Sequence, residues 1–244
     1  MALINEWEKT GNWLFVRRSW FPLFFIAAGI LVMIFDGNDI SFALTYEMIC
    51  LAVSLFGELI RIVAVGYAPK NTSGRNTKAG QVADCINTTG IYSLIRHPLY
   101  VGNFFMWLGP VLFIRSFWFT IVFFLAYWLY YERIMFAEEQ FLRKKFGDAY
   151  DKWSEKVKAV IPHSFKVTKT NLPFSLKTVL RREYNSIFNV FLIFLGLDIC
   201  RNFIINKQIA PSPIWMWLFV GGLVFWIIVR VLYKKTSLFN VEGR

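Results

Sequence analysis

Apolar residues in this sequence gather in long runs, and polar residues gather in the stretches between them. A helix that crosses a membrane needs about 20 consecutive, mostly apolar residues. Six apolar segments can be drawn, at residues 20–35, 41–67, 98–114, 116–133, 186–206 and 212–233. This pattern predicts an all-α fold, a polytopic integral membrane helix bundle with about six hydrophobic helices.

Two of these segments, 98–114 and 116–133, are short for a membrane span, and only Arg115 and Ser116 stand at their junction. We therefore expect a tight helical hairpin. Its second helix is expected to continue beyond the apolar residues, through residues 131–157, as a cytosolic helical extension. No small-residue cleavage site follows the first apolar run, so we expect no cleaved signal peptide.

Composition supports a membrane protein. Of the 244 residues, 56% are hydrophobic and only 18% are charged, whereas soluble domains carry about 25% charged residues. The three cysteines form no CxxC pair, so the sequence indicates neither a zinc site nor a disulfide framework, and we expect no metal.

The net charge of +11 lies mostly in the loops. Residues 137–185 hold eleven Lys or Arg against six acids. Basic loops normally face the cytosol, and with both termini cytosolic every strongly basic stretch falls on that side. The charge therefore indicates membrane topology, and we expect no nucleic-acid partner.

Residues 90–110, GIYSLIRHPLYVGNFFMWLGP, place charged groups directly before an apolar helix. Pro98 has the fixed φ of a first helical residue, so the free N–H groups of the helix point toward Arg96 and His97, an arrangement that suits an anion. The glycines permit close backbone approach. The other interpretation is a positive-inside anchor with an interfacial belt of tyrosines.

Two carboxylates follow on the extension. With about 100° per residue, Glu138 and Glu139 lie within the apolar stripe of the helix, where an acid usually needs a cationic partner. That partner is either a bound cation or a basic residue of the same helix, Arg143 or Lys145. Within segment 41–67, Glu58 and Arg61 are spaced to pair in the same way.

A cation-binding carboxylate pair and an anion-binding helix start, both at the cytosolic surface, suit a ligand with a positive centre and a carboxylate. S-adenosylmethionine is one such ligand. The glycine-rich GxGxxG turn of soluble nucleotide-binding folds does not occur in the sequence.

The ordered motifs TTGIYSLIRHPLYVGN, EEQFLRKKFGDAYDKW and VIP resemble the isoprenylcysteine carboxyl methyltransferase and phospholipid methyltransferase superfamily. The resemblance covers roughly residues 80–165. It implies a membrane methyltransferase domain at 1–180 and an additional C-terminal helix pair at 181–244, which no family motif requires. We expect this pair to buttress the core or to build part of the acceptor entrance.

The resemblance also implies the site residues. Arg96, His97 and Glu138 would be catalytic, and S-adenosylmethionine would be bound by Tyr92, His97, Pro98, Leu99, Tyr100, Glu138 and Glu139. Some members place an acceptor-binding arginine four residues before the glutamate. Here that position is Ile134, so Arg133 is the nearest candidate for substrate binding.

The resulting hypothesis is an S-adenosylmethionine-dependent, multi-pass membrane methyltransferase with its active site facing the cytosol. We expect the membrane to be the bacterial inner membrane. Its partner would be a membrane lipid or lipidated substrate. We favour O-methylation of an anionic headgroup, a phosphate such as that of lipid A or a carboxylate, because an oxygen anion needs no catalytic base. The alternatives are a phosphatidylethanolamine-type N-methyltransferase, an NADPH-dependent membrane reductase of related fold, and a non-catalytic relative.

Overall fold

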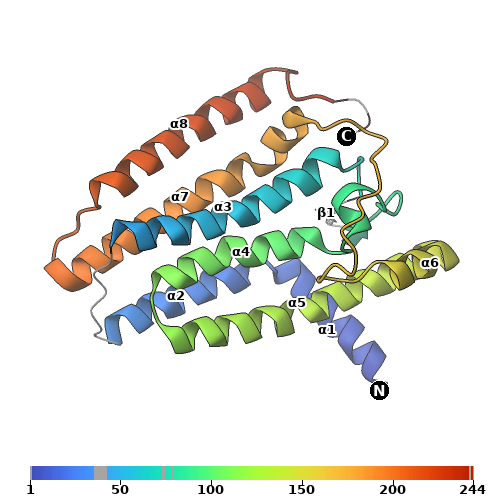
Figure 1. The fold of residues 1–244 in the computed structure, drawn as a ribbon, viewed down its shortest axis with the longest axis horizontal. Coiled ribbons are helices and arrows are strands. Elements are labelled where there is room, and N and C mark those ends of the chain that lie inside the picture. The colour runs from blue at the N-terminus through green and yellow to red at the C-terminus, as the bar shows by residue number, and fades with distance from the viewer. Residues whose placement is uncertain (1, 36–42, 73–74, 78–79, 242, 244) are drawn as a thin grey trace.

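The computed structural model describes residues 2–35, 43–72, 75–77, 80–241 and 243. For residues 75–77 and 80 it describes the backbone alone. Residues 41 and 42 of the second apolar segment lie outside these ranges. The described chain is a bundle of helices with one small hairpin of strands (Figure 1). The helices are α1 (Leu3–Arg17), α2 (Trp20–Phe35), α3 (Leu44–Tyr67), α4 (Pro98–Phe113), α5 (Phe117–Phe146), α6 (Asp148–Lys156), α7 (Leu176–Asn206) and α8 (Pro213–Lys235).

The predicted all-α membrane bundle is confirmed, and α2, α3, α4, α5, α7 and α8 stand at the six apolar segments. Among the described residues, α3, α5, α7 and α8 are long and apolar enough to cross a membrane. α1 and α2 meet the same criteria only together, bent by 71° at a short break, which would make a fifth span. α4 has 16 residues, or about 24 Å of helix, which is too short for a full span.

The hairpin of α4 and α5 turns where the sequence predicted, because Arg115 adopts a left-handed φ of 59°. α5 then runs for 30 residues to Phe146, and α6 follows it, so residues 131–157 are largely helical but divided between two helices, and the cytosolic position of this extension stays a prediction. α5 ends at Gly147, whose φ is 53°.

α3 and α4 approach each other closely where glycines of each helix face the other. A Cβ on Gly102 would lie 2.7 Å from Cγ of Arg61 and 2.8 Å from the carbonyl oxygen of Gly57. Small residues allow such close helix approach in membrane bundles. The contact brings Arg61 of α3 beside the first turns of α4.

The polar loops gather at one end of the bundle, where the helical extension, α6 and the hairpin of β1 (Arg75–Thr77) and β2 (Gly80–Val82) lie (Figure 1). The 3₁₀ turn η1 (Gly90–Ser93) leads from this region into α4. α7 and α8 lie along the outer side of α3 in the view of Figure 1. Their residues Val190, Phe194 and Trp215 belong to the same hydrophobic core as α2 to α5, and the predicted division at residue 180, which falls inside α7, stays a prediction.

A buried ionic cluster ties α7 and α8 to α3 at the end away from these loops. Arg201 donates hydrogen bonds to Glu47 and Asp198, and the indole N–H of Trp215 donates to the other oxygen of Glu47 at 2.6 Å. All four side chains are buried. Because both carboxylates depend on one guanidinium, the cluster holds three helices in one relative position.

Arg201→Met is expected to lower the free energy of unfolding by about 3–5 kcal/mol, because it leaves two buried carboxylates without their cation. Thermal unfolding of the purified protein in detergent measures this change. Lys177→Met, at an exposed position of the same helix, is the control and should change stability by less than about 0.5 kcal/mol. Equal melting temperatures for the two variants would contradict the role given to the cluster.

Candidate active site

The segment that precedes α4 is held by backbone pairing with a distant part of the chain. The N–H groups of Arg96 and His97 donate to the carbonyls of Lys158 and Ala159 at 2.9 and 3.0 Å. Further upstream, the N–H of Gly90 donates to the carbonyl of Thr168. The stretch that follows α6 therefore lies along the Arg-His-Pro segment and fixes it in space.

Glu139 lies beneath this segment and organises it. Its Oε1 accepts a hydrogen bond from Nε of Arg96 at 2.9 Å and lies 2.9 Å from Nε2 of His97. The Nη1 of Arg96 also donates to the carbonyls of Ser154 and Val157. Arg96 thus joins α5, the end of α6 and the segment before α4, and the predicted cationic partner of Glu139 comes from another part of the chain.

Glu138 faces a different group. Its Oε2 accepts a hydrogen bond from the hydroxyl of Tyr100 at 2.9 Å and lies 3.9 Å from Nδ1 of His97. Arg143, the same-helix partner considered from the sequence, pairs instead with Asp151 at 2.7 Å. The carboxylate of Glu138 is therefore positioned by a neutral phenol, which leaves its negative charge to interact with a ligand.

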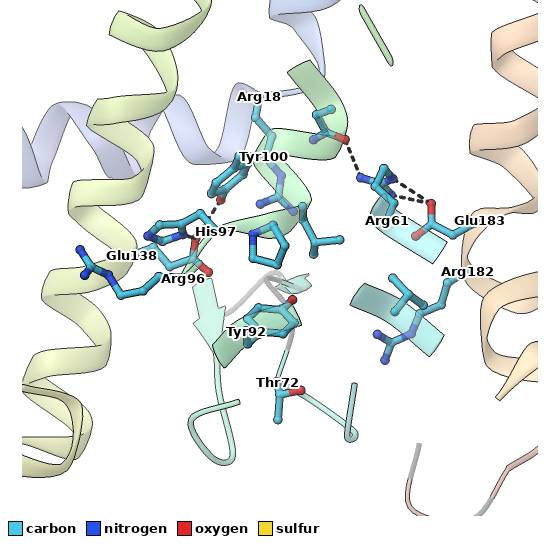
Figure 2. Close-up of a pocket in the computed structure, with 14 residues that line it drawn as sticks. Arg18, Arg61, Thr72, Tyr92, Arg96, His97, Tyr100, Glu138, Arg182 and Glu183 are labelled. Atoms are coloured by element: carbon cyan, nitrogen blue, oxygen red, sulfur yellow. Dashed lines mark hydrogen bonds and ion pairs between the residues drawn. The ribbon is translucent and has the colours of Figure 1, made fainter. Parts of the chain in front are cut away.

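These groups surround a cavity of about 340 Å³, within the range of about 300–1,000 Å³ typical of small-molecule sites. We call it the first cavity (Figure 2). Seven of the predicted site residues line it: Tyr92, Arg96, His97, Pro98, Leu99, Tyr100 and Glu138. Residues of η1, of the segment before α4, of α4 and of α5 are thus brought together.

The other two predicted residues lie elsewhere. Glu139 is not part of the lining and acts on it through Arg96 and His97. Arg133 lies five residues before Glu138, or about 140° away around the helix, and its guanidinium covers the ring of Trp7 at 3.9 Å. Its neighbour Ile134 is fully buried.

The first cavity also contains residues that the sequence motifs did not indicate. They come from the N-terminal break, α3, the loop after α3, α4 and α7, and are Arg18, Arg61, Val65, Thr72, Asn103, Arg182 and Glu183. Within this group, Glu183 of α7 accepts two hydrogen bonds from Arg61 (Figure 2). The predicted partner of Arg61, Glu58, lies farther away, at 3.9 Å.

Tyr92 contributes a neutral donor to the first cavity. Burial, together with the nearby charge of Glu138, raises the pKa of the Tyr92 phenol well above its ordinary value. The hydroxyl therefore stays protonated throughout the neutral range and offers a hydrogen bond to a ligand at any physiological pH.

Fold and site together define a class: an integral, multi-pass membrane protein with a polar ligand cavity at one end of its bundle. Residues 48–149 match the family model described as phospholipid methyltransferase. These residues include α4, the Arg-His-Pro segment and both glutamates of α5.

Curated relatives give the same indication. The chain is 32% identical over 118 residues to protein-S-isoprenylcysteine O-methyltransferase of Schizosaccharomyces pombe, covering 48% of this chain and 50% of the relative. It is 31% identical over 113 residues to a probable protein-S-isoprenylcysteine O-methyltransferase of Oryza sativa, covering 46% and 59%. The chain thus spans about half the length of these relatives. No solved structure matches it significantly.

Residues 48–149 are thus similar to phospholipid methyltransferases, and the curated relatives with significant similarity are isoprenylcysteine O-methyltransferases. This is the similarity that the sequence motifs indicated. The residues that the family model matches do not extend to α7 and α8, but α7 nevertheless supplies Arg182 and Glu183 to the first cavity.

Proposed function

We propose that this chain is a membrane methyltransferase that uses S-adenosylmethionine to methylate an anionic oxygen of a lipid-linked acceptor. The observation that carries this proposal is the first cavity, whose lining combines the carboxylate of Glu138, the start of α4 and several guanidinium groups. Such a cavity matches a ligand that has both a cationic centre and a carboxylate.

The residues present fit S-adenosylmethionine. Glu138 would hold the cationic end, because its Oε2 is fixed by Tyr100 and faces the cavity. The positive end of the α4 dipole would favour the carboxylate, although the N–H groups of Tyr100 and Val101, expected from the sequence to be free, donate to the carbonyl of His97. His97, Pro98 and Leu99 would form the wall between them, with Tyr92 as a further donor, and Glu139 would keep Arg96 and His97 in place. When bound, this cofactor supplies an electrophilic methyl group on a sulfonium centre.

A second cavity adjoins the first and suits the acceptor. Its volume is about 460 Å³, and it shares Arg18, Arg61 and Asn103 with the first cavity. Its other walls come from α2, α4, α5 and α7 and are largely apolar. Two of its lining residues, Leu23 and Leu192, are 56% and 43% exposed, so a hydrocarbon chain could enter between α2 and α7 directly from the bilayer.

The proposed reaction needs no proton transfer by the protein. An acceptor carboxylate or phosphate is already deprotonated at neutral pH, so the protein need only position the two reactants and exclude water. His97, the nearest candidate base, is already bound to Glu139 at 2.9 Å. The matched relatives are named as O-methyltransferases of isoprenylcysteine, which favours a carboxylate. We also propose that the site faces the cytosol, because residues 137–185 are rich in Lys and Arg and basic loops normally lie on that side.

The proposal is tested with the full chain in lipid vesicles, methyl-labelled S-adenosylmethionine and two acceptors, an S-farnesylcysteine peptide and a total membrane lipid extract. We expect label on the peptide carboxylate, located by mass spectrometry. Label on a lipid phosphate would retain O-methylation and change the acceptor. Label on a lipid amine would replace the proposal with N-methylation, and binding of NADPH without binding of S-adenosylmethionine would indicate a reductase.

A further inference from the structure

The wall shared by the two cavities is formed by two guanidinium groups and one amide, those of Arg18, Arg61 and Asn103. This wall is where a group in the second cavity would meet a ligand in the first. The charge of Arg61 is paired with Glu183, but a guanidinium can still bind a carboxylate through two parallel hydrogen bonds, and Arg18 adds a second positive charge at this junction.

Arg61 has hydrogen-bond donors to spare at this wall. Its Nε and Nη2 donate to Oε2 of Glu183 at 3.0 and 2.6 Å, and its Nη1 donates to Oδ1 of Asn103 at 2.6 Å. A guanidinium carries five N–H groups, so one on Nη1 and one on Nη2 have no partner within the part of the chain that the structure describes. The side chain is 19% exposed, which is enough to present these two donors to the cavities.

The partner that holds Arg61 comes from a helix outside the matched family segment. Glu183 lies on α7, 122 positions along the chain from Arg61, and is 2% exposed. A long arginine side chain loses much conformational freedom when it is held in one position. By accepting two hydrogen bonds, Glu183 keeps the guanidinium at the shared wall before any acceptor arrives.

We propose that Glu183 is a positioning residue for the acceptor, and that the Arg61 it holds, together with Arg18, receives the acceptor's carboxylate. This inference rests on the proposed function, since it assigns the second cavity to a lipid-linked carboxylate. It makes α7 part of the specificity of the enzyme. The second cavity has further α7 residues in its wall, including Ser186 and Asn189.

Glu58 provides a comparison within the same neighbourhood. It is as buried as Glu183, it lies 3.9 Å from Arg61, and neither of its oxygens accepts a hydrogen bond within the described part of the chain. Two carboxylates thus lie near one guanidinium, and only one of them determines its orientation. Replacing Glu58 removes a nearby negative charge, whereas replacing Glu183 also removes the hydrogen bonds that orient Arg61. Comparing the two variants therefore separates the two effects.

The test measures binding of N-acetyl-S-farnesylcysteine and of its methyl ester to the full chain, alongside binding of S-adenosylmethionine, by calorimetry in detergent. Wild-type protein should bind the carboxylate form more tightly than the ester. Glu183→Leu should raise the dissociation constant of the carboxylate form at least tenfold, leave that of the ester unchanged, and alter cofactor affinity less than twofold.

Two further variants make the result specific. Glu183→Gln should recover most of the affinity, because both donors of Arg61 converge on one oxygen, which the amide retains. Glu58→Gln should not weaken binding of the carboxylate. Asn185→Ala, on α7 but bonded to Trp226 of α8, controls for general damage to the helix.

Each outcome decides the question. If Glu183→Leu weakens both forms of the probe and the cofactor alike, Glu183 only fastens α7 to α3 and the inference fails. It also fails if wild type does not prefer the carboxylate, or if phosphatidic acid competes for the site better than the farnesylcysteine probe. If wild type shows the preference and Glu183→Leu removes it, but no methyl transfer occurs, the inference stands and the proposed function fails.

Discussion

Glu138→Gln is expected to weaken binding of S-adenosylmethionine by a factor on the order of 100 and to abolish methyl transfer at ordinary cofactor concentrations. A hydrogen-bonded charge contributes about 1.5–3 kcal/mol, and each 1.4 kcal/mol is tenfold in affinity. Glu138 lies in the first cavity with its carboxylate fixed by Tyr100. The amide keeps the size of the side chain and loses the negative charge.

Calorimetric titration of the variant with the cofactor measures this effect. Glu132→Gln is the matched control, because Glu132 occupies an exposed position of the same helix and should leave affinity unchanged. If Glu138→Gln folds normally and binds the cofactor as tightly as wild type, the role assigned to Glu138 is wrong.

Arg96→Met should cause the other large loss, and for a different reason. Arg96 donates to Glu139 and to the carbonyls of Ser154 and Val157, so its removal leaves a carboxylate and two carbonyls without their donor. Breaking a buried ion pair costs about 3–5 kcal/mol. Since Glu139 is 24% exposed, we expect a value near the lower end, together with loss of cofactor binding as His97 shifts.

Thermal unfolding and cofactor titration together check this expectation. The control is Arg143→Met, which breaks the exposed pair with Asp151 and should cost less than about 1 kcal/mol. A variant Arg96→Met that unfolds at the wild-type temperature would show that Arg96 contributes no structural support to the site. Glu138→Gln should differ from it by losing cofactor affinity with little change in stability.

The local half of the site could be predicted because it depends on neighbours in the sequence. Pro98 favours the start of a helix because of its fixed φ and its missing N–H. The helical period places Glu138 inside the apolar stripe. The motifs therefore indicated the residues of η1, α4 and α5 that now line one cavity.

The other half depends on how helices pack. Arg61 could be paired from the sequence only with Glu58, because spacing along one helix carries no information about α7. Its closer partner is Glu183, which the bundle brings in through the contact of α3 with α4 and α7. The six apolar segments, in contrast, could be found from hydropathy alone, and the shortness of segment 98–114 agrees with the 16 residues of α4.

The backbone pairing of residues 95–97 with 158–159 makes α6 a spacer of fixed length. α5 carries Glu138 and Glu139 to the site, α6 adds nine residues, and the chain must then return in register to meet Arg96 and His97. A change of one residue in this return path would place the next carbonyl opposite His97 and turn its neighbours to the other side. We therefore expect an insertion or deletion between Gly147 and Lys158 to displace Arg96 and His97, whereas substitutions at the exposed positions of α6 should leave the site in place.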